Sequence, residues 1–323
     1  MADEFSFRPY VAADEPTWNA LVAASPNGTF LFDRGFMGYH ADRFDDASLM
    51  IERRGRLAAV LPANRLGRRL ASHGGLSYGG LVLADTLGQQ AMWDLLQALQ
   101  RHCRAQGVSE LLYKTVPSIY HRLPCEEDRW ALWRCGAQLA RRDALAAIGP
   151  TAAHWPAGRR RSITRATRQR PELALGGHAG CPAEAVEDWS AFWVLLEREL
   201  QARHGSHPVH SAEEIRLLAA RFPAAISLRW ARWSGELVGG LVLFETPTVV
   251  HLQYMAADDQ GRRCAALDLL LEQAIAHAQA AGKWFDFGHS NEQEGRELNP
   301  GLAFYKESFG ASTVVHDHYL LPC

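Results

Sequence analysis

The sequence predicts an α/β fold with mixed sheets, in which one structural unit occurs twice along the 323-residue chain. The first observation is an order of strand, turn, helix, strand, loop and helix over residues 248–311. The second is an internal repeat that relates residues 55–143 to residues 235–317. The third is a composition of 47% hydrophobic and 22% charged residues, which is typical of a globular protein long enough for two cores.

The later copy shows its elements most clearly. Residues 249–255 are β-branched and aromatic, as suits a largely buried strand. Apolar residues then recur at helical spacing over 265–281, and Gly282 stands where a C-terminal cap is expected. Residues 283–288 predict a second strand, parallel to the first through a right-handed crossover. A short last helix is expected at about 301–309.

The repeat is indicated by landmarks that keep a nearly constant offset along the chain. Asp94-Leu95-Leu96 lies in the long helix expected for the first copy, and Asp268-Leu269-Leu270 lies at the same place in the second. Glycines also match at the start, middle and end of the two copies. These pairs are Gly55 with Gly235, Gly107 with Gly282, and Gly136 with Gly310.

Two domains follow from this repeat, one at residues 1–150 and one at 151–323, with a basic linker at 158–170. The linker reads GRRRSITRATRQR and is the strongest charge run in the chain. One interpretation is a solvated helix face or connecting segment. The other is a binding surface for a phosphate-rich ligand, because arginine offers forked donors that suit phosphate.

Charge and cysteine usage exclude several classes of protein. A formal net charge of −2 does not indicate general nucleic-acid binding, so a polyanion would need a local basic patch. The six cysteines include no C-x-x-C pair, which argues against a zinc ribbon or a disulfide framework. No apolar run is long enough to span a bilayer, and the beginning MADEFSFRPY lacks the features of a signal peptide. We therefore expect a cytoplasmic protein.

The later copy resembles a known family. Its order of elements and its Asp286-Phe287-Gly288 strand end resemble the C-terminal half of the FemAB-like branch of the GNAT acyltransferase superfamily. Residues 260–265 resemble the superfamily's Q/R-x-x-G-x-G/A loop in a different spacing. Proteins of this branch are tandem GNAT-like domains, in agreement with the repeat. The F-K-x-x-F-G element of the branch is matched here by Tyr305, Lys306, Phe309 and Gly310.

The resemblance implies a candidate site in the later copy. Lys306 would stabilise the oxyanion or hold the carrier phosphate, Tyr305 would donate a proton, and Asp286 would belong to the acceptor site. Gly261, Arg262 and Arg263 form the Gly/Arg turn, which precedes a helix whose free N–H groups suit a pyrophosphate. In the superfamily, the strand before this turn binds the acyl carrier through its backbone. The residues expected to bind the donor are Gln253, Tyr254, Gln260, Gly261, Arg262 and Arg263.

Other polar residues are expected to bind the acceptor. A glycine-rich turn, several strand ends and the RHGSHPVHS segment all place polar side chains where a ligand could lie. The H-x-x-H-x-x-H spacing of that segment is interrupted by Gly205 and Pro208, so we predict no metal there. The expected acceptor-binding residues are His73, Tyr78, Lys114, Tyr120, Arg203, His204, His210, Ser290 and Asn291.

The sequence thus predicts an N-acyltransferase that uses acyl-CoA, such as acetyl-CoA, and no metal, and whose acceptor is a small-molecule, sugar or peptide amine. Aminoacyl-tRNA is the alternative donor, which the resemblance and the arginine run favour. We prefer acyl-CoA because the net charge is slightly negative and no extended basic face is evident. A GNAT-like protein that binds a ligand without chemistry is the remaining alternative.

Overall fold

The computed structural model describes residues 4–151, 155–168 and 172–323, without the side chains of His40 and His204. These residues form two compact units. The first contains the chain up to Ala144, together with Asn291–Leu298 and Val314–Cys323. The second contains Leu145–Ser290 and Asn299–Thr313. The C-terminal strand therefore belongs to the first unit, whereas the sequence suggested that all residues after 150 would form the second domain.

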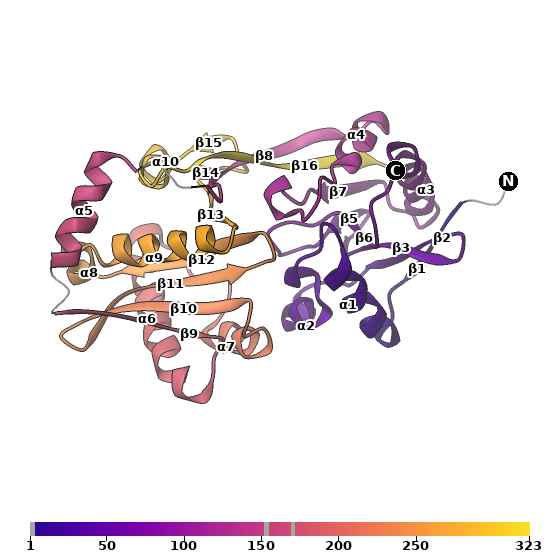
Figure 1. Cartoon of the computed structure of the whole chain (residues 1–323). Coiled ribbons are helices and arrows are strands. Elements are labelled where there is room, and N and C mark those ends of the chain that lie inside the picture. The colour runs from indigo at the N-terminus through magenta and orange to yellow at the C-terminus, as the bar shows by residue number, and fades with distance from the viewer. Residues whose placement is uncertain (1–3, 152–154, 169–171) are drawn as a thin grey trace. The chain divides into compact units, whose positions relative to one another are not determined.

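The first unit combines two groups of strands with two longer helices (Figure 1). Short 3-10 turns lie at Ala12–Asp14, Phe30–Phe32, Gly38–Arg43 and Ser118–Tyr120. The helices are α1 (Glu15–Ala24), α2 (Arg34–Met37), α3 (Gln89–Ala105) and α4 (Glu127–Arg134). The strands are β1 (Phe5–Pro9), β2 (Leu49–Arg53), β3 (Arg56–Leu61), β4 (Ala63–Leu66), β5 (Arg69–Ser72), β6 (Val82–Leu83), β7 (Glu110–Lys114), β14 (Asn291–Glu292), β15 (Glu297–Leu298) and most of β16 (Ser312–Pro322).

The second unit is a sheet with helices packed against it (Figure 1). A 3-10 turn lies at Ala183–Ala185. The helices are α5 (Ala157–Arg168), α6 (Val186–His204), α7 (Ala212–Arg221), α8 (Asp259–Arg263), α9 (Ala266–Ala280) and α10 (Pro300–Glu307). The strands are β9 (Leu173–Ala179), β10 (Ile226–Trp233), β11 (Glu236–Glu245), β12 (Val249–Ala257) and β13 (Trp284–His289). The strand β8 (Gln138–Ile148) begins in the first unit and ends in the second.

Both units contain parallel as well as antiparallel strand pairs, as predicted. In the first unit, one sheet has the order β1-β2-β3-β6, and a second group has the order β4-β5-β7-β16-β8, with β5 parallel to β7. In the second unit the order is β8-β13-β12-β11-β10-β9. There β12 and β13 are parallel, and α9 lies between them in the chain, which confirms the parallel pairing expected from the sequence. Their neighbours in this unit pair antiparallel.

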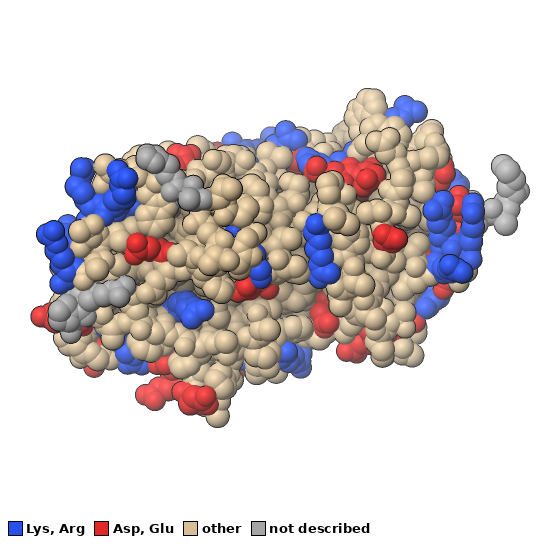
Figure 2. Space-filling view, viewed as in Figure 1, with Lys and Arg blue, Asp and Glu red and all other residues tan. Residues whose placement is uncertain are grey.

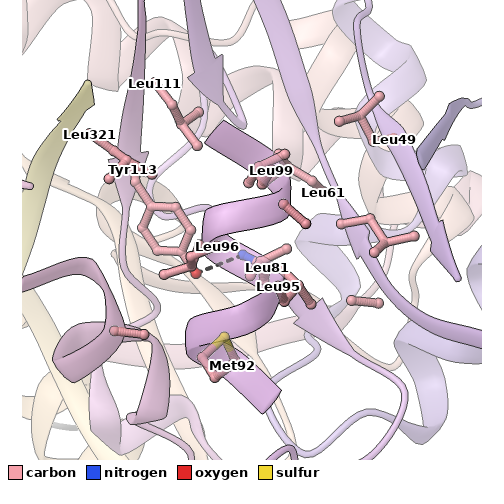
Figure 3. Packing of buried hydrophobic residues seen from close by; sticks show 14 of the residues in the cluster. Leu49, Leu61, Leu81, Met92, Leu95, Leu96, Leu99, Leu111, Tyr113 and Leu321 are labelled. Carbon is pink, nitrogen blue, oxygen red and sulfur yellow. Dashed lines mark hydrogen bonds between the residues drawn. The ribbon is translucent and has the colours of Figure 1, made fainter. Parts of the chain in front are cut away.

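Each unit has its own hydrophobic core. In the first, the apolar face of α3 packs against β3 and β7 through Leu95, Leu96 and Leu99, which are fully buried (Figure 3). The Tyr113 hydroxyl lies in this core, where it accepts a hydrogen bond from the Leu81 N–H at 3.0 Å and donates one to Asp128 at 2.8 Å. In the second, α9 covers one face of β11, β12 and β13. Burial of these helix faces is the main stabilising contribution.

The two units repeat the same local design. The succession strand, long helix, strand, short helix, strand is shared by β3-α3-β7-α4-β8 and β11-α9-β13-α10-β16, with further strands inserted between β3 and α3, between β11 and α9, and between β13 and α10. Matched turns have glycine in the left-handed region, which side chains with a Cβ rarely adopt. These pairs are Gly55 (φ 76°) with Gly235 (φ 91°), Gly107 (71°) with Gly282 (68°), and Gly136 (81°) with Gly310 (87°). The predicted internal repeat is therefore visible in the backbone.

The basic run at 158–170 is mainly a helix. Helix α5 covers Ala157–Arg168, and the last two residues of the run lie outside the described residues. Ile163 and Ala166 are buried in the core of the second unit, so α5 is a packed element of that unit instead of a linker. Among the described residues, no helix is both long and apolar enough to cross a membrane.

Candidate functional site

The strands β12 and β13 separate after three paired residues. Pairing runs from Val249 with Trp284 to His251 with Asp286, while the other edge of β13 pairs with β8 from Phe285 to His289. Beyond His251, β12 continues to Ala257 with no strand on that side in the described structure. Its backbone N–H and C=O groups therefore form an open edge inside the second unit, which an extended ligand could use for hydrogen bonds.

A bulge lies at the beginning of this open edge. Val242 of β11 pairs with Tyr254, and the next residue, Leu243, pairs with Leu252, so Gln253 is left over on β12. A bulge bends the strand and increases its twist. The bend accounts for the separation of β12 from β13, which the sequence alone could not show. Gln253 and Tyr254, both expected to bind the donor, thus lie on the strand segment that separates.

A histidine and an aspartate meet where the strands part. The Nδ1 atom of His251 lies 3.0 Å from Oδ2 of Asp286, and Oδ1 of Asp286 accepts a hydrogen bond from the Gly288 N–H at 2.7 Å. Asp286 is 1% exposed, whereas 20% of the His251 side chain is exposed. A carboxylate on Nδ1 keeps the proton on that nitrogen and leaves the Nε2 lone pair available as a base. The sequence pointed to Asp286 but not to His251.

Lys306 holds the chain that follows Asp286. Its Nζ donates to the carbonyls of Gly288 at 3.0 Å and His289 at 2.6 Å, and the residue is only 3% exposed. Burial lowers the pKa of Lys306 to about 8, although the nearby Asp286 carboxylate opposes this shift. Lys306 therefore fixes the chain just after Asp286, and its predicted contact with the oxyanion or the carrier phosphate stays a prediction.

Tyr305 lies beside Arg159 of α5. Its ring lies 5.3 Å from that of Phe309, and the guanidinium of Arg159 lies 4.0 Å from the Phe309 ring centre and 5.0 Å from that of Tyr305. Burial raises the pKa of Tyr305, and the Asp268 carboxylate adds to this effect. The predicted role of Tyr305 as proton donor stays a prediction, and its contacts favour a packing role.

The Gly/Arg turn is a short helix, α8, whose arginines are already paired. The carboxylate of Asp258 caps it by accepting the Gly261 N–H at 2.7 Å. Arg262 pairs with Glu199 at 2.8 Å and also contacts Asp259 and the Ala257 carbonyl. The side chain of Gln260 accepts from Arg263 at 2.9 and 3.1 Å. A pyrophosphate at this turn would have to compete with these internal partners.

The N-terminus of α9 is covered in a similar way. Asp268, in its first turn, accepts from Arg159 at 2.5 Å and from Ser162 at 2.6 Å, and both of these residues lie on α5. Arg159 also donates to Ser308 at 2.5 and 3.2 Å. A carboxylate in the first turn satisfies the positive end of the helix dipole. This end of α9 is thus occupied by α5 in the place where the sequence suggested a phosphate.

The acceptor residues predicted in the RHGSHPVHS segment are only partly brought together. Nδ1 of His210 lies 2.7 Å from the hydroxyl of Tyr254 on β12, so these two predicted residues are in contact. Burial raises the pKa of Tyr254. Arg203 is exposed and pairs with Glu199 at 3.4 Å. The His204 side chain lies outside the described part of the chain.

Ser290 and Asn291 directly follow β13. The Ser290 carbonyl accepts from Asn299 N–H at 2.9 Å, and the residue is 4% exposed. Asn291, which belongs to the first unit, accepts the Ala144 N–H at 2.7 Å. Both residues therefore have structural contacts, and their role in substrate binding stays a prediction.

The four acceptor residues predicted in the first unit form one buried cluster. Lys114 donates to the carbonyls of His73 at 2.7 Å and Leu76 at 2.5 Å, and burial lowers its pKa to about 8. The ring of Tyr78 lies 4.8 Å from that of Tyr120. His73 also borders a cavity of about 260 Å³ in this unit. These contacts bring the four residues together, and substrate binding there stays a prediction.

A second group was missed altogether. Asp143 on β8 and His316 and His318 on β16 bring their ligand atoms within 4.8 Å of one another in the first unit. Burial lowers the pKa of His316 to about 4 and that of His318 to about 3. The alternation His-Asp-His was the available signal, because it places both histidines on one face of a strand.

The surface of the second unit has a basic strip on α5. Arg160, Arg161, Arg165 and Arg168 are exposed and form no ion pair with any residue that the structure describes. Figure 2 shows Lys and Arg side chains gathered over this helix. Among the arginines of the run that the structure describes, Arg159 alone turns inward, to Asp268. These four arginines are thus solvent-exposed, as the first interpretation of the run requires. They are also the side chains that would bind a phosphate-rich ligand in the second interpretation.

Comparison with known proteins agrees with this geometry. Residues 157–306 match the model of the acetyltransferase (GNAT) domain family, and no curated protein matches the sequence. The structure is similar to that of FemX, with a TM-score of 0.66 and 10% identity over 97% of this chain and 96% of that chain. It is also similar to L-PGS from Bacillus licheniformis, with a TM-score of 0.61 and 12% identity over 97% and 92%.

A third similar structure is that of a tandem GNAT protein from the clavulanic acid biosynthesis pathway. Its TM-score is 0.50, with 15% identity over 99% of this chain and 98% of that chain. At these identities the likeness establishes the fold, and the family match covers the second unit from α5 to α10, including the open edge of β12. Residues 157–306 therefore match the GNAT acetyltransferase domain family, and the chain as a whole has the fold of tandem GNAT proteins.

Proposed function

We propose that the second unit transfers an acyl or aminoacyl group from a phosphate-bearing carrier to an amine. The observation that carries this proposal is the open edge of β12 beyond His251, with the His251 and Asp286 pair at its beginning. An extended carrier could hydrogen-bond to the backbone of 252–257 and present its carbonyl near the point where the strands part. Such positioning supplies much of the rate of an acyl transfer.

The residues at the fork can move the proton that the reaction requires. The amine nitrogen attacks the carbonyl carbon, a C–N bond forms, and the nitrogen loses one proton. We assign Nε2 of His251 as its acceptor, because Nδ1 faces the Asp286 carboxylate. The bond from the carbonyl carbon to the carrier then breaks, and the departing thiol or hydroxyl takes the proton back. Asp286 stabilises the imidazolium in between.

The acyl donor is either acyl-CoA or aminoacyl-tRNA. The sequence favoured acyl-CoA because of the Gly/Arg turn, but Arg262 is engaged by Glu199 and Asp259, and the first turn of α9 is covered by α5 through Asp268. These contacts weaken the case for a pyrophosphate there. The exposed arginines of α5 instead support an aminoacyl-tRNA donor. Helix α5 packs against α9, and α9 begins at Ala266, soon after the open edge ends at Ala257. The arginines are therefore placed to bind the phosphates of a carrier that lies along this edge. We therefore propose aminoacyl-tRNA as the donor, with acyl-CoA as the second candidate.

Binding measurements on the whole chain separate these donors. Calorimetry and thermal shift would compare CoA, acetyl-CoA and charged tRNA at several salt concentrations. We expect tRNA binding whose affinity falls steeply as salt rises, since phosphate contacts release counterions. Tight CoA binding without tRNA binding would assign acyl-CoA instead. If neither binds, the proposal of a transferase is wrong and a non-catalytic ligand-binding protein is favoured.

A further inference from the structure

Three potential metal ligands are held together on two strands of the first unit. Asp143, His316 and His318 are 2%, 5% and 9% exposed, and their ligand atoms lie within 4.8 Å of one another. Nε2 of His318 is 4.0 Å from Oδ2 of Asp143, and the two imidazole ring centres are 4.6 Å apart. His316 and His318 lie two residues apart on β16, so their side chains leave the same face of the strand.

The histidines have buried nitrogens without a partner. Nε2 of His316 and Nε2 of His318 are both shielded from solvent and form no hydrogen bond within the described residues. An unsatisfied buried polar atom costs about 1–3 kcal/mol, and such atoms are uncommon in native proteins. Two of them facing one carboxylate are difficult to explain by packing. They are readily explained by a small ligand that accepts two nitrogen lone pairs.

The surroundings resemble an outer shell of a metal site. Nε of Arg141 donates to both oxygens of Asp143, at 3.0 and 2.9 Å, and the Thr115 backbone hydrogen-bonds the His316 ring. Ligating carboxylates and imidazoles are usually oriented by such hydrogen bonds. Lys114 is the cross-strand neighbour of His318, but its Nζ is directed to the His73 and Leu76 carbonyls.

The donor set and the local charge select the kind of metal. Asp143 is the only carboxylate of the cluster, and the cations Arg141 and Lys114 are nearby. Hard cations such as Mg²⁺ and Ca²⁺ require several oxygen ligands and are disfavoured there. Neutral imidazole nitrogens suit Zn²⁺ and its neighbours in the transition series.

We propose that Asp143, His316 and His318 bind one transition-metal ion of the zinc type, with a fourth position left for water. Tetrahedral zinc with nitrogen and oxygen ligands needs ligand atoms roughly 3.3 Å apart, so small side-chain rotations would close the cluster onto the ion. The ion would link β8 to the C-terminal strand β16. This inference does not depend on the proposed transferase activity.

The first test measures metal binding by the whole protein. The chain is stripped with a chelator, loaded with Zn²⁺ or Co²⁺, freed of excess metal and analysed for metal content. We expect about one equivalent of Zn²⁺, an upward shift of the melting temperature, and Co²⁺ absorption bands of a four-coordinate site. Zinc X-ray absorption on the unchanged protein should count two imidazoles. Less than a tenth of an equivalent would overturn the proposal and leave an ordered water as the ligand.

Matched variants locate the ion. His316→Gln and His318→Gln should each lower Zn²⁺ affinity at least tenfold, while His207→Gln, at an exposed histidine of the H-x-x-H-x-x-H segment, should leave it unchanged. If a cluster variant does not fold, the imidazole count on the unchanged protein together with the His207→Gln result still decides the matter. Loss of zinc in His207→Gln alone would place the ion elsewhere and contradict the assignment.

Discussion

The Nδ1 atom of His251 and the Oδ2 atom of Asp286 lie 3.0 Å apart at the last paired position of β12 and β13. Up to this pair the strands are joined by a ladder, and beyond it the edge of β12 is open. The pair therefore links a geometric feature of the sheet to the one group in the second unit that we assign as a base.

His251→Gln should lower the rate of transfer without unfolding the protein. Glutamine keeps a side-chain amide beside Asp286 but cannot accept the proton of the amine, so kcat is expected to fall by about 10²–10⁴-fold. Single-turnover kinetics with the donor identified by the binding measurements would check this. The matched control is His277→Gln, since His277 pairs with Glu245 at the surface of the same unit. Equal activity of His251→Gln and the parent would rule out His251 as the base.

Lys306→Met should destabilise the second unit, because it leaves the Gly288 and His289 carbonyls without their donor. We expect a loss of about 2–4 kcal/mol in the free energy of unfolding, measured by denaturant titration. Activity would fall because Asp286 loses its fixed position. Full retention of stability would show that Nζ does not hold these carbonyls.

The pH dependence of Lys306 has a defined sign. Burial lowers its folded pKa to about 8 from the ordinary 10.5, so the unfolded chain binds more protons between these values. Burying the charged form of Lys306 has a free-energy cost that is fully present below pH 8. This cost is removed as the pH rises from about 8 towards 10.5, so the free energy of unfolding increases over that range. Lys114 has a similarly lowered pKa and adds to the effect. Parallel titrations of the parent and Lys306→Met should differ in slope over this range, and identical slopes would contradict the assignment.

Asp268→Ala should loosen α5. The change leaves Arg159 without its carboxylate in a contact where both side chains are mostly buried, so we expect a loss of about 2–4 kcal/mol. Hydrogen exchange of residues 157–168 should speed up. Asp94→Ala is the control at the matching position of the first copy, where the Asp94 side chain accepts a hydrogen bond from Gln90 at the surface. Similar effects of both changes would mean that Asp268 has no special role.

Replacing the four exposed arginines of α5 should weaken tRNA binding selectively. The combined variant Arg160→Gln, Arg161→Gln, Arg165→Gln and Arg168→Gln should make tRNA affinity less sensitive to salt. The log–log slope should become shallower by roughly 0.7–0.9 for each phosphate that the variant no longer neutralises. CoA binding should not change. Titration of both ligands would measure this.

The control for this variant keeps the total change in charge. Four exposed arginines of the first unit, Arg56, Arg68, Arg104 and Arg122, are replaced by glutamine in the same way. An equal loss of tRNA affinity in the two variants would show that only net charge matters. It would also remove the main support for aminoacyl-tRNA as the donor.

Local pattern determined much of the architecture. The apolar spacing of 265–281 and the β-branched run of 249–255 gave the helix α9 and the strand β12 within a few residues. Matched glycines gave the repeat, because each occupies a turn with positive φ where other residues are strained. These features depend on neighbours in the chain, so the sequence alone could predict them.

The tertiary structure decided what depends on partners far apart in the chain. His251 and Asp286 meet only because β12 and β13 pair for three residues, and Arg159 turns inward only because Asp268 is there to receive it. The Asp143, His316 and His318 cluster likewise requires β8 and β16 to lie together. The sequence thus determined the doubled α/β design. Long-range packing decided which polar groups are exposed, which are paired, and which are buried without a hydrogen-bond partner.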